Sequence, residues 1–391
     1  MPSLRLLCPN GHLGFAPIKP GSFAIGCAAE PDAICADSGS CDVGPGPLGA
    51  DNSSSPRQWQ MQDLETMLLA ARRLAVPMII GSAGDTGSNS RVDLFVAMIR
   101  EIAAKHRLPE FRLGYFHSEI TKEDLRRRML AGDTVEGLDG RAPLDLVTLE
   151  ATDRIVAVAG VHPYIELLDK GADVIIGGRS SDCAIFAAPA IRRGFPPALA
   201  YFAGKLLECA SFCAEPYAAK ESVLGEITMD DVKVTAMLPE QRCTIASVAG
   251  HAMYERANPF HEHFLGGHIE MRDCRYEQYD ERTVRIAGPR YVPAGELRVK
   301  LEGAGKIGER YVGIVGVRDP YTIAHLEEVI AWARGQAEEQ LGSGSGWELH
   351  YTVYGRDAIL GAMEPQRHKP AHELGIVVQA IAPTRELAEE A

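Results

Sequence analysis

The chain has 391 residues, 46% of them hydrophobic, which is enough to bury one large or two to three ordinary domains and excludes a disordered chain. Its net charge of −13 opposes non-specific binding to nucleic acid or to an anionic membrane, because the long-range field repels phosphate. No apolar run reaches the roughly 20 residues of a membrane span, and the N-terminal apolar stretch is too short for a secretory signal, so we expect a soluble cytoplasmic protein.

The first 220 residues alternate between strand and helix patterns. Expected strands lie at 4–8, 33–36, 76–80, 111–116, 155–160 and 173–178, and expected helices at 61–74, 92–102 and 161–171. Pro163 suits a first helical turn and Gly171 a helix stop. Strands joined through helices must be parallel, so the pattern predicts an α/β fold with a doubly wound, mostly parallel sheet.

The character of the sequence changes after residue 220. We expect residues 221–295 to form a polar, aromatic and loop-rich section that packs on the core, with antiparallel strands. Residues 296–391 predict a smaller α+β section with one long helix between strands. The final TRELAEEA is typical of a helix that has just begun, so we expect a truncated C-terminus.

The nine cysteines are scattered between Cys8 and Cys274 without a Cys-x-x-Cys pair. They show none of the spacings of a zinc finger. We therefore expect reduced thiols that pack as small hydrophobes.

Three polar, glycine-rich segments each follow an expected strand: ADSGSCDVGPGP, GSAGDTGSNSR and GGRSSDCA. In a parallel sheet all three emerge at the carboxyl ends of strands, where open α/β folds bind ligands. Carboxylates there can act as general acids and bases, or as ligands for Mg²⁺ or Mn²⁺. The alternative for any one aspartate is helix capping or turn formation. The catalytic candidates are Asp37, Asp42, Asp85 and Asp182.

The second segment opens onto a helix with Ser88 or Ser90 as a possible N-cap. Its glycines allow close backbone approach, and the helix N-terminus favours a phosphate, a carboxylate or the pyrophosphate of coenzyme A. A purely structural loop is the alternative. In the third segment, Arg179 can bind a carboxylate or phosphate through a bidentate contact, or form an ion pair with Asp182. The substrate-binding candidates are Ser38, Ser40, Gly84, Thr86, Gly87, Ser88, Arg179, Ser180, Ser181, Lys220, His251 and Asn258.

Several histidines gather in the polar section: His251, His261, His263 and His268. They predict either a metal site or ordinary hydrogen-bonded and exposed side chains, and no H-E-x-x-H motif is present. Lys220 either closes over a ligand or lies on the surface. Covalent hydrolase chemistry has little support, because the sequence has no G-x-S-x-G elbow and no acylating cysteine signature.

Four long segments resemble the acyclic terpene utilisation (AtuA-like) family: EPDAICADSGSCDVGPGPLG, VPMIIGSAGDTGSNSRVDLF, GADVIIGGRSSDCAIFAAPA and SVAGHAMYERANPFHEH. The resemblance covers nearly the whole chain. It implies a link to the catabolism of acyclic terpenes such as citronellol and geraniol, whose acids are processed as CoA thioesters. It transfers no catalytic residues. Some longer relatives end in a ferredoxin-like domain, which this chain is expected to lack.

The leading hypothesis is a catabolic enzyme that acts on a carboxylic acid or acyl-CoA by lyase, hydratase or isomerase chemistry next to a carbonyl. Asp37 or Asp42 would move the proton. Gly84, Asp85 and Thr86, with Arg179, would hold the anion or the enolate oxygen; Ser180, Ser181 and Asp182 would orient the substrate or a metal.

Two alternatives remain open. One is a non-catalytic ligand-binding or complex-forming subunit that requires a partner. The other is a metal-dependent hydrolase, which needs Asp42, Asp85 and a histidine in one cavity. The expected ligand is a small carboxylate or a CoA thioester, the cofactor is unknown with Mg²⁺ or Mn²⁺ possible, and the assembly is a homo-oligomer or includes a second small subunit.

Overall fold

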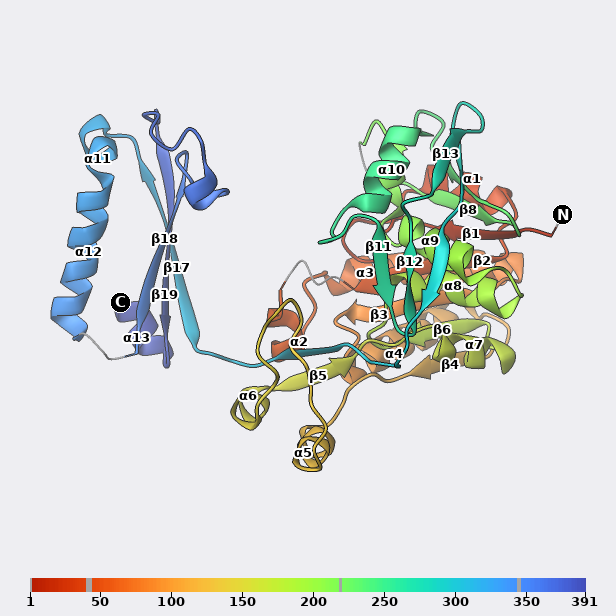
Figure 1. The fold of residues 1–391 in the computed structure, drawn as a ribbon, viewed down its shortest axis with the longest axis horizontal. Helices are drawn as coiled ribbons and strands as arrows, with labels where there is room; N and C mark the ends of the chain where they lie inside the picture. The colour runs from red at the N-terminus through yellow and green to blue at the C-terminus, as the bar shows by residue number, and fades with distance from the viewer. Residues whose placement is uncertain (1, 40–43, 218–219, 343–345) are drawn as a thin grey trace. The chain divides into compact units, whose positions relative to one another are not determined.

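The computed structural model describes residues 2–39, 44–217, 220–342 and 346–391 (Figure 1). The chain divides into two compact units, unit 1 (Met1–Gly305) and unit 2 (Lys306–Ala391). Each unit has its own sheet and its own hydrophobic cores, so the two are described separately.

Unit 1 is built on a nine-stranded sheet in the order β13-β14-β9-β8-β1-β2-β3-β6-β4. The strands β1, β2, β3, β6 and β4 are parallel, and the other four join the β1 edge as antiparallel neighbours. This arrangement confirms the α/β fold and the parallel N-terminal strands, within a sheet that is mixed overall. The bounds are β1 Leu4–Cys8, β2 Ala33–Gly39, β3 Met78–Asp85, β4 Leu113–Phe116, β6 Val174–Gly177, β8 Val223–Ile227, β9 Val232–Ala236, β13 Arg275–Gln278 and β14 Thr283–Ala287.

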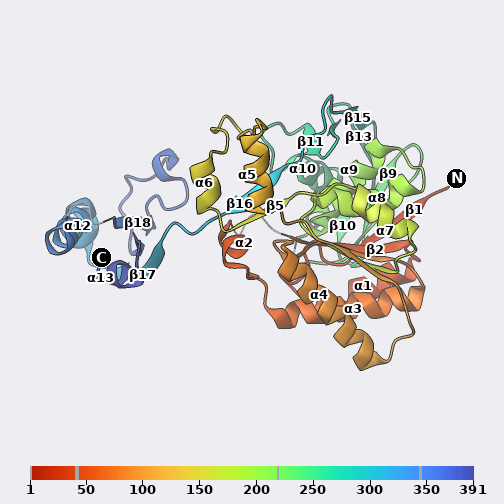
Figure 2. The same ribbon diagram turned by 90° about the horizontal axis from the view of Figure 1, so that it is seen from below.

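Helices cover both faces of this sheet, which confirms the doubly wound arrangement (Figure 2). Successive strand side chains point to opposite faces. In β2, Ala33 and Cys35 join one core, whereas Ile34 and Ala36 join the other. One face is covered by α1 (Pro20–Ala28), α3 (Arg57–Leu74) and α4 (Asn89–His106), and the other by α7 (His162–Asp169), α8 (Asp182–Arg192) and α9 (Pro197–Leu207).

The strand expected at 155–160 lies outside the central sheet. It forms β5 (Arg154–Ala157), which pairs with β16 (Leu301–Ala304) in a separate two-stranded sheet. Two helices of the preceding insert, α5 (Lys122–Leu130) and α6 (Leu146–Ala151), pack on β5 through a small apolar cluster. Because β6 takes the place between β3 and β4, β5 is left to pair with a strand from the far end of unit 1.

The remaining elements of unit 1 are short. Two of its small sheets pair β7 with β10, and β11 with β12 and β15. The eight described cysteines are free, as the sequence predicts. The bounds of these elements are α2 Gly46–Ala50, the 3₁₀ helix Ala210–Cys213, β7 Ala214–Glu215, β10 Arg242–Cys243, α10 Ile245–Met253, β11 His261–Phe264, β12 Gly267–Glu270 and β15 Arg290–Pro293.

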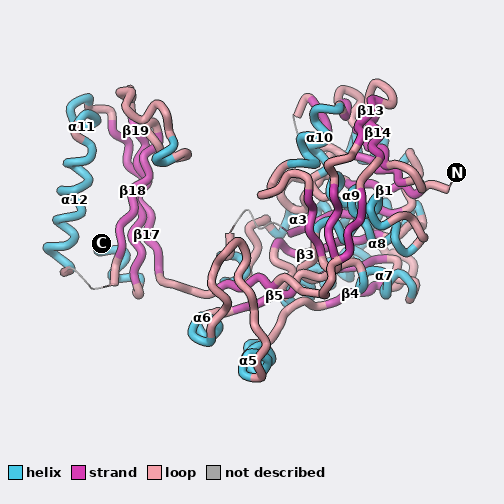
Figure 3. Tube along the Cα trace, in the orientation of Figure 1, coloured by secondary structure: helices cyan, strands magenta, loops and turns pink. Residues whose placement is uncertain are grey.

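Unit 2 is a three-stranded antiparallel sheet in the order β17-β19-β18, with helix α12 packed against it (Figure 3). Its element order, β-α-β-β-α, matches the first five elements of a ferredoxin-like domain. The expectation that the chain lacks a ferredoxin-like domain stays a prediction. The bounds are β17 Glu309–Val317, α11 Pro320–Ala324, α12 Leu326–Leu341, β18 Glu348–Tyr354, the 3₁₀ helix Gly361–Met363, β19 Leu374–Ala382 and α13 Arg385–Glu390.

The core between the sheet and helices α1, α3 and α4 provides a test of the fold. Phe95 on α4 is fully buried, so we expect Phe95→Ala to lower the free energy of unfolding by about 3–5 kcal/mol, through lost burial and the cavity left behind. Leu130→Ala, at a side chain that is 70% exposed, should stay within about 0.5 kcal/mol of the parent. Urea unfolding followed by circular dichroism measures both; equal losses would contradict this core.

Candidate functional site

The carboxyl ends of β2, β3 and β6 bring three of the predicted segments together. β2 runs through Asp37 to Gly39, and Gly39 pairs with Asp85 at the end of β3 after a shift in register. The loop after β6 is tied to the loop after β3, because the N–H of Arg179 donates to the carbonyl of Gly87 at 3.1 Å. Gly87 has φ +62°, and a Cβ there would lie 2.1 Å from the nitrogen of Arg179, so only glycine fits.

Arg179 is the centre of a buried ion-pair network. Its guanidinium donates to both carboxylate oxygens of Glu302 at 2.8 and 3.3 Å, and to Oδ1 of Asp182 at 3.3 Å. It also donates to the hydroxyl of Ser82 at 2.9 Å. Burial lowers the pKa of Arg179, but the charges of Asp182 and Glu302 outweigh it and raise that pKa overall. The internal pair with Asp182 is thus present, and Glu302 is a second partner that sequence reasoning missed.

Asp37 is nearly inaccessible to solvent and feels the charges of Arg179 and Asp182. Burial raises its pKa well above the usual range, and the negative charge of Asp182 raises it further, while Arg179 and the N–H of Gly39 oppose this. The neighbouring Ser38 is fully buried, and its hydroxyl has no hydrogen-bond partner among the described residues. Ser40 and Asp42 lie outside the described residues.

Asp85 holds the turn that precedes α3. Its two carboxylate oxygens accept hydrogen bonds from the backbone and hydroxyl groups of Ser54 and Ser55, at 2.8 to 3.0 Å for three of the four. Ser88 is the N-cap residue of α4, but its hydroxyl donates to Asp51 at 3.0 Å and accepts no hydrogen bond from the described N–H groups of the first helical turn. These bonds join the loop after β3 to the turn before α3. Asp85 thus holds a turn, which is the alternative role that the sequence allows for an aspartate.

Two cavities in unit 1 meet at this network, and Arg179 and Lys300 line both of them. Both volumes fall in the range of roughly 300–1,000 Å³ that is usual for small-molecule sites. The first, which we call the carboxylate cavity, measures about 420 Å³ and is lined by Leu138, Val158, Arg179, Ser180, Ser181, Asp182, Glu208, Glu262, His263, Phe264, Leu265, Arg298 and Lys300. The second, the loop cavity, measures about 550 Å³ and is lined by Gly44, Pro45, Pro47, Leu48, Asp85, Thr86, Arg141, Arg179, Lys300, Glu302 and Gly303.

Two buried ion pairs each contribute a carboxylate to the lining of the carboxylate cavity: Lys205 with Glu208, and Arg256 with Glu262. Burial raises the pKa of Glu208 to about 8, against the lowering effect of Lys205. Burial likewise raises the pKa of Glu262, and Arg256 opposes it. Sequence reasoning missed both carboxylates. For Glu208, the signal in the sequence was the segment AYFAGKLLECA. Lys205 and Glu208 are the charged residues of this otherwise apolar stretch at the end of α9.

Asp37, Ser38, Gly84, Gly87 and Ser88 line neither cavity, and neither do the three predicted residues that lie outside the strand-end loops. His251 is buried, and its burial together with the charges of Lys205 and Arg256 lowers its pKa to about 3. The side chain of Asn258 accepts from the N–H of Phe260 and shapes the turn before β11. The ammonium group of Lys220 lies 5.4 Å from the ring centre of Phe15.

The metal hypothesis finds no ligand group in the part of the chain that the structure describes. The rings of His261, His263 and His268 lie within 4.9 to 5.9 Å of one another on the β11–β12 hairpin. Among the described residues, no set of three or more His, Cys, Asp or Glu side chains has the geometry to hold a metal ion. Of these histidines, His263 lines the carboxylate cavity.

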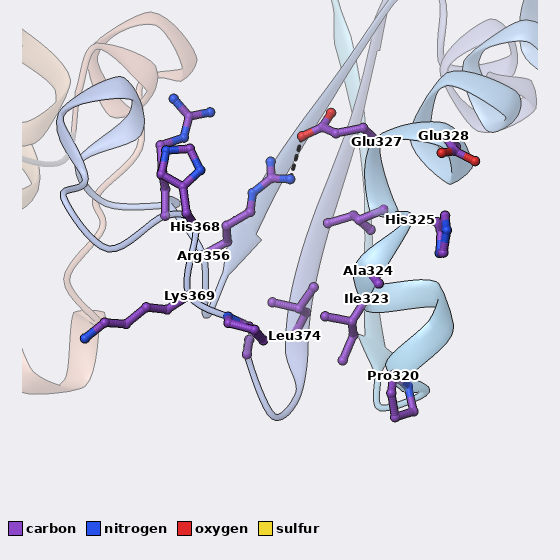
Figure 4. A pocket seen from close by; sticks show the side chains of 14 residues that line it. Pro320, Ile323, Ala324, His325, Glu327, Glu328, Arg356, His368, Lys369 and Leu374 are labelled. Carbon is purple, nitrogen blue, oxygen red and sulfur yellow. Dashed lines mark hydrogen bonds and ion pairs between the residues drawn. The ribbon is translucent and has the colours of Figure 1, made fainter.

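Unit 2 contains a cavity of its own, of about 490 Å³ (Figure 4). Ile323 and Leu374 contribute apolar lining, and basic side chains such as Lys369 stand at its rim. The guanidinium of Arg356 is directed at Glu327 and donates to it at 2.6 Å. None of the residues selected from the sequence lines this cavity.

The fold and the cavities define a class: an α/β protein with a charged, ligand-sized site at the carboxyl ends of its parallel strands. The family model described as acyclic terpene utilisation family protein AtuA matches residues 4–391, so the chain belongs to the AtuA family. No curated protein and no solved structure matches the chain. Among the described helices, none is long and apolar enough to cross a membrane.

The Arg179–Glu302 pair predicts a pH dependence of stability. Burial alone would raise the pKa of Glu302, but Arg179 and Lys300 lower it to about 2 from its usual 4.5. A carboxylate with a depressed folded-state pKa contributes stability above pH 4.5 that is lost as the pH falls toward 2. We therefore expect Glu302→Gln to destabilise the protein at pH 7 by about 1–3 kcal/mol, the usual worth of hydrogen bonds to charged groups.

The difference between Glu302→Gln and the parent should shrink as the pH is lowered from about 4.5 toward 2, which thermal melts at a series of pH values will show. The control is Glu296→Gln, which breaks an exposed pair with Arg298 and should change stability by less than about 1 kcal/mol. A pH-independent loss at Glu302 would show that the pair does not act through charge.

Proposed function

We propose that the chain is a catabolic enzyme that acts on a carboxylic acid or its CoA thioester, by proton transfer at the carbon next to the carbonyl. The reaction class is that of a lyase, a hydratase or an isomerase. One observation carries the proposal: the carboxylate cavity places the buried carboxyl group of Glu208 in a ligand-sized space that also contains Arg298 and Lys300.

Glu208 is suited to act as the base. A general base works best when its pKa lies near the working pH, and burial raises the pKa of Glu208 to about 8. In the proposed step, Glu208 takes the proton, and the C–H electron pair moves into the enolate. Return of the proton at another carbon gives an isomerase, whereas loss of a substituent from the next carbon gives a lyase or hydratase.

Cations in the same cavity can bind the anionic substrate and the enolate oxygen. Arg179 is already committed to Glu302 and Asp182, so its charge acts mainly through the field at the cavity wall. Lys300 is half-exposed, pairs with Glu302 at 2.9 Å and lines both cavities, which makes it the better candidate for direct contact. Preorganised charge of this kind stabilises a developing oxyanion.

Asp37 and Asp182 remain candidates for the second proton transfer. Asp182 lines the carboxylate cavity, and its charge helps keep the pKa of Asp37 raised. Two nearby carboxyl groups with different environments are a common way to divide the roles of acid and base. Membership of the AtuA family supports a branched carboxylic acid, free or as a thioester, as the substrate.

Binding is tested first. We expect branched acids derived from citronellol and geraniol, or their CoA thioesters, to raise the melting temperature of the purified protein, with Mg²⁺, Mn²⁺ and Zn²⁺ added in parallel samples. Binding to the folded state alone stabilises a protein by about 2.7 kcal/mol at a ligand concentration 100 times Kd. Lys300→Gln should weaken this stabilisation, and a flat response across the panel contradicts the proposal.

Proton transfer is tested with the compounds that bind. In D₂O, the protein should exchange deuterium into the carbon next to the carbonyl, observed by NMR, at a rate that rises with pH through about 8 as Glu208 loses its proton. Glu208→Gln should slow exchange by about 10²–10⁴-fold, the usual worth of a positioned general base, without abolishing the thermal shift.

Glu262→Gln is the matched control, because it also removes a buried carboxylate and an ion pair from the same cavity. It should leave most of the exchange rate. An equal loss of exchange rate in the two variants would show that damage to the cavity, and not the loss of Glu208 as a base, slows the exchange. Binding without any exchange in the parent protein would instead support a ligand-binding or complex-forming subunit.

A further inference from the structure

The loop between β18 and β19 is much longer than the connection of two paired strands requires. These strands form an antiparallel pair, which a turn of about two to five residues can join. The chain instead runs from 355 to 373 between them. The loop is folded on itself: the N–H of Ala358 donates to the carbonyl of Val353 at 3.1 Å, and the N–H of Lys369 donates to that of Gln366 at 2.8 Å. Ordered loops of this length are uncommon and usually functional.

This loop forms one wall of the cavity in unit 2, and the helices α11 and α12 form the other wall (Figure 4). From the loop, Arg367 and Lys369 line the cavity. Its floor is apolar, because Leu374 is buried in the hydrophobic core of unit 2 and Ile323 packs against that core. All of the described lining residues lie between 320 and 374, so the cavity is built without β17 and without α13.

The loop is basic, although the chain as a whole has a net charge of −13. Residues 365–372, PQRHKPAH, contain an arginine, a lysine and two histidines but no acidic residue. A local concentration of positive charge on an acidic protein attracts anions to that place. The wall that the loop contributes to the cavity therefore favours an anionic ligand.

Two of the cations in the lining are only weakly neutralised by carboxylates. Arg356 is already paired, because its guanidinium donates to Glu327 at 2.6 Å. Arg367 lies 3.6 Å from Asp357, which is longer than a hydrogen bond, and Lys369 donates to an uncharged side-chain amide at 3.2 Å. Arg367 and Lys369 are thus the cations best placed to bind an anion from solution.

We propose that the cavity of unit 2 binds a small amphipathic anion, whose carboxylate or phosphate group lies at Arg367 and Lys369 and whose apolar part lies on Ile323 and Leu374. Arginine matches the oxygens of a carboxylate or phosphate with paired N–H donors, and lysine adds a point charge. Small-molecule sites commonly combine an apolar lining with a few polar groups that fix the ligand. This site uses no residue of the chemistry proposed for unit 1, so the two stand independently.

Methyl NMR of the full chain with isotope-labelled isoleucine reports binding in this cavity separately from binding in unit 1. The signal of Ile323 is assigned by its loss in Ile323→Leu. Phenylacetate and phenyl phosphate each join an anion to an apolar ring, whereas benzyl alcohol lacks the charge and inorganic phosphate lacks the ring. We expect one or both aromatic anions to shift the Ile323 signal to saturation, and benzyl alcohol and inorganic phosphate to bind about tenfold more weakly or less. A response to only one aromatic anion identifies the bound group as carboxylate or as phosphate.

Charge variants test the role of the loop in the same titration. Arg367→Gln combined with Lys369→Gln should weaken binding of the aromatic anions by about tenfold, because both charged donors are lost. Arg385→Gln is the matched control: it removes an arginine of unit 2 whose side chain is 78% exposed and lies outside the cavity lining, so the affinity should stay unchanged. An Ile323 signal that responds to neither aromatic anion, equal binding of benzyl alcohol or inorganic phosphate, or equal affinity in the double variant and the control would overturn the proposal.

Discussion

The ion pair between Arg179 and Glu302 connects the parts of unit 1 on which the site depends. Arg179 follows β6 in the central sheet, whereas Glu302 lies on β16, 123 residues further along the chain. A guanidinium that is 7% exposed needs partners for its charge, because an unpaired buried cation is strongly destabilising. The pair therefore ties the β5–β16 sheet to the carboxyl ends of the parallel strands, and its arginine lines both cavities.

Local patterns were enough to predict the parallel core. The apolar run at the start of β2 and the helical spacing in α3 and α4 depend on neighbouring residues alone, and strands joined through helices must be parallel. The pattern at 155–160 predicted a strand correctly, but whether a strand joins the main sheet depends on which neighbour is available. Here β6 occupies that place, and β5 pairs with β16 instead.

The candidate site was predictable to the same extent. The meeting of Asp37, Asp85 and Arg179 follows from strand ends in a parallel sheet, so motif position was sufficient. Glu302 and Glu208 were missed because nothing in their own segments reports what lies opposite them in space. Asp85 lies at the end of β3, as predicted. Its hydrogen bonds with Ser54 and Ser55 could not be predicted, because nothing in the sequence shows which residues meet in space.

Arg179 and Lys300 form a common wall between the two cavities, and this wall has a thermodynamic consequence. An anion bound in one cavity would partly neutralise the charge felt in the other, so binding in the two cavities would be linked. Such linkage is reciprocal: whatever factor one ligand applies to the affinity of the second, the second applies to the first. Two anionic ligands, one in each cavity, would therefore weaken each other's binding.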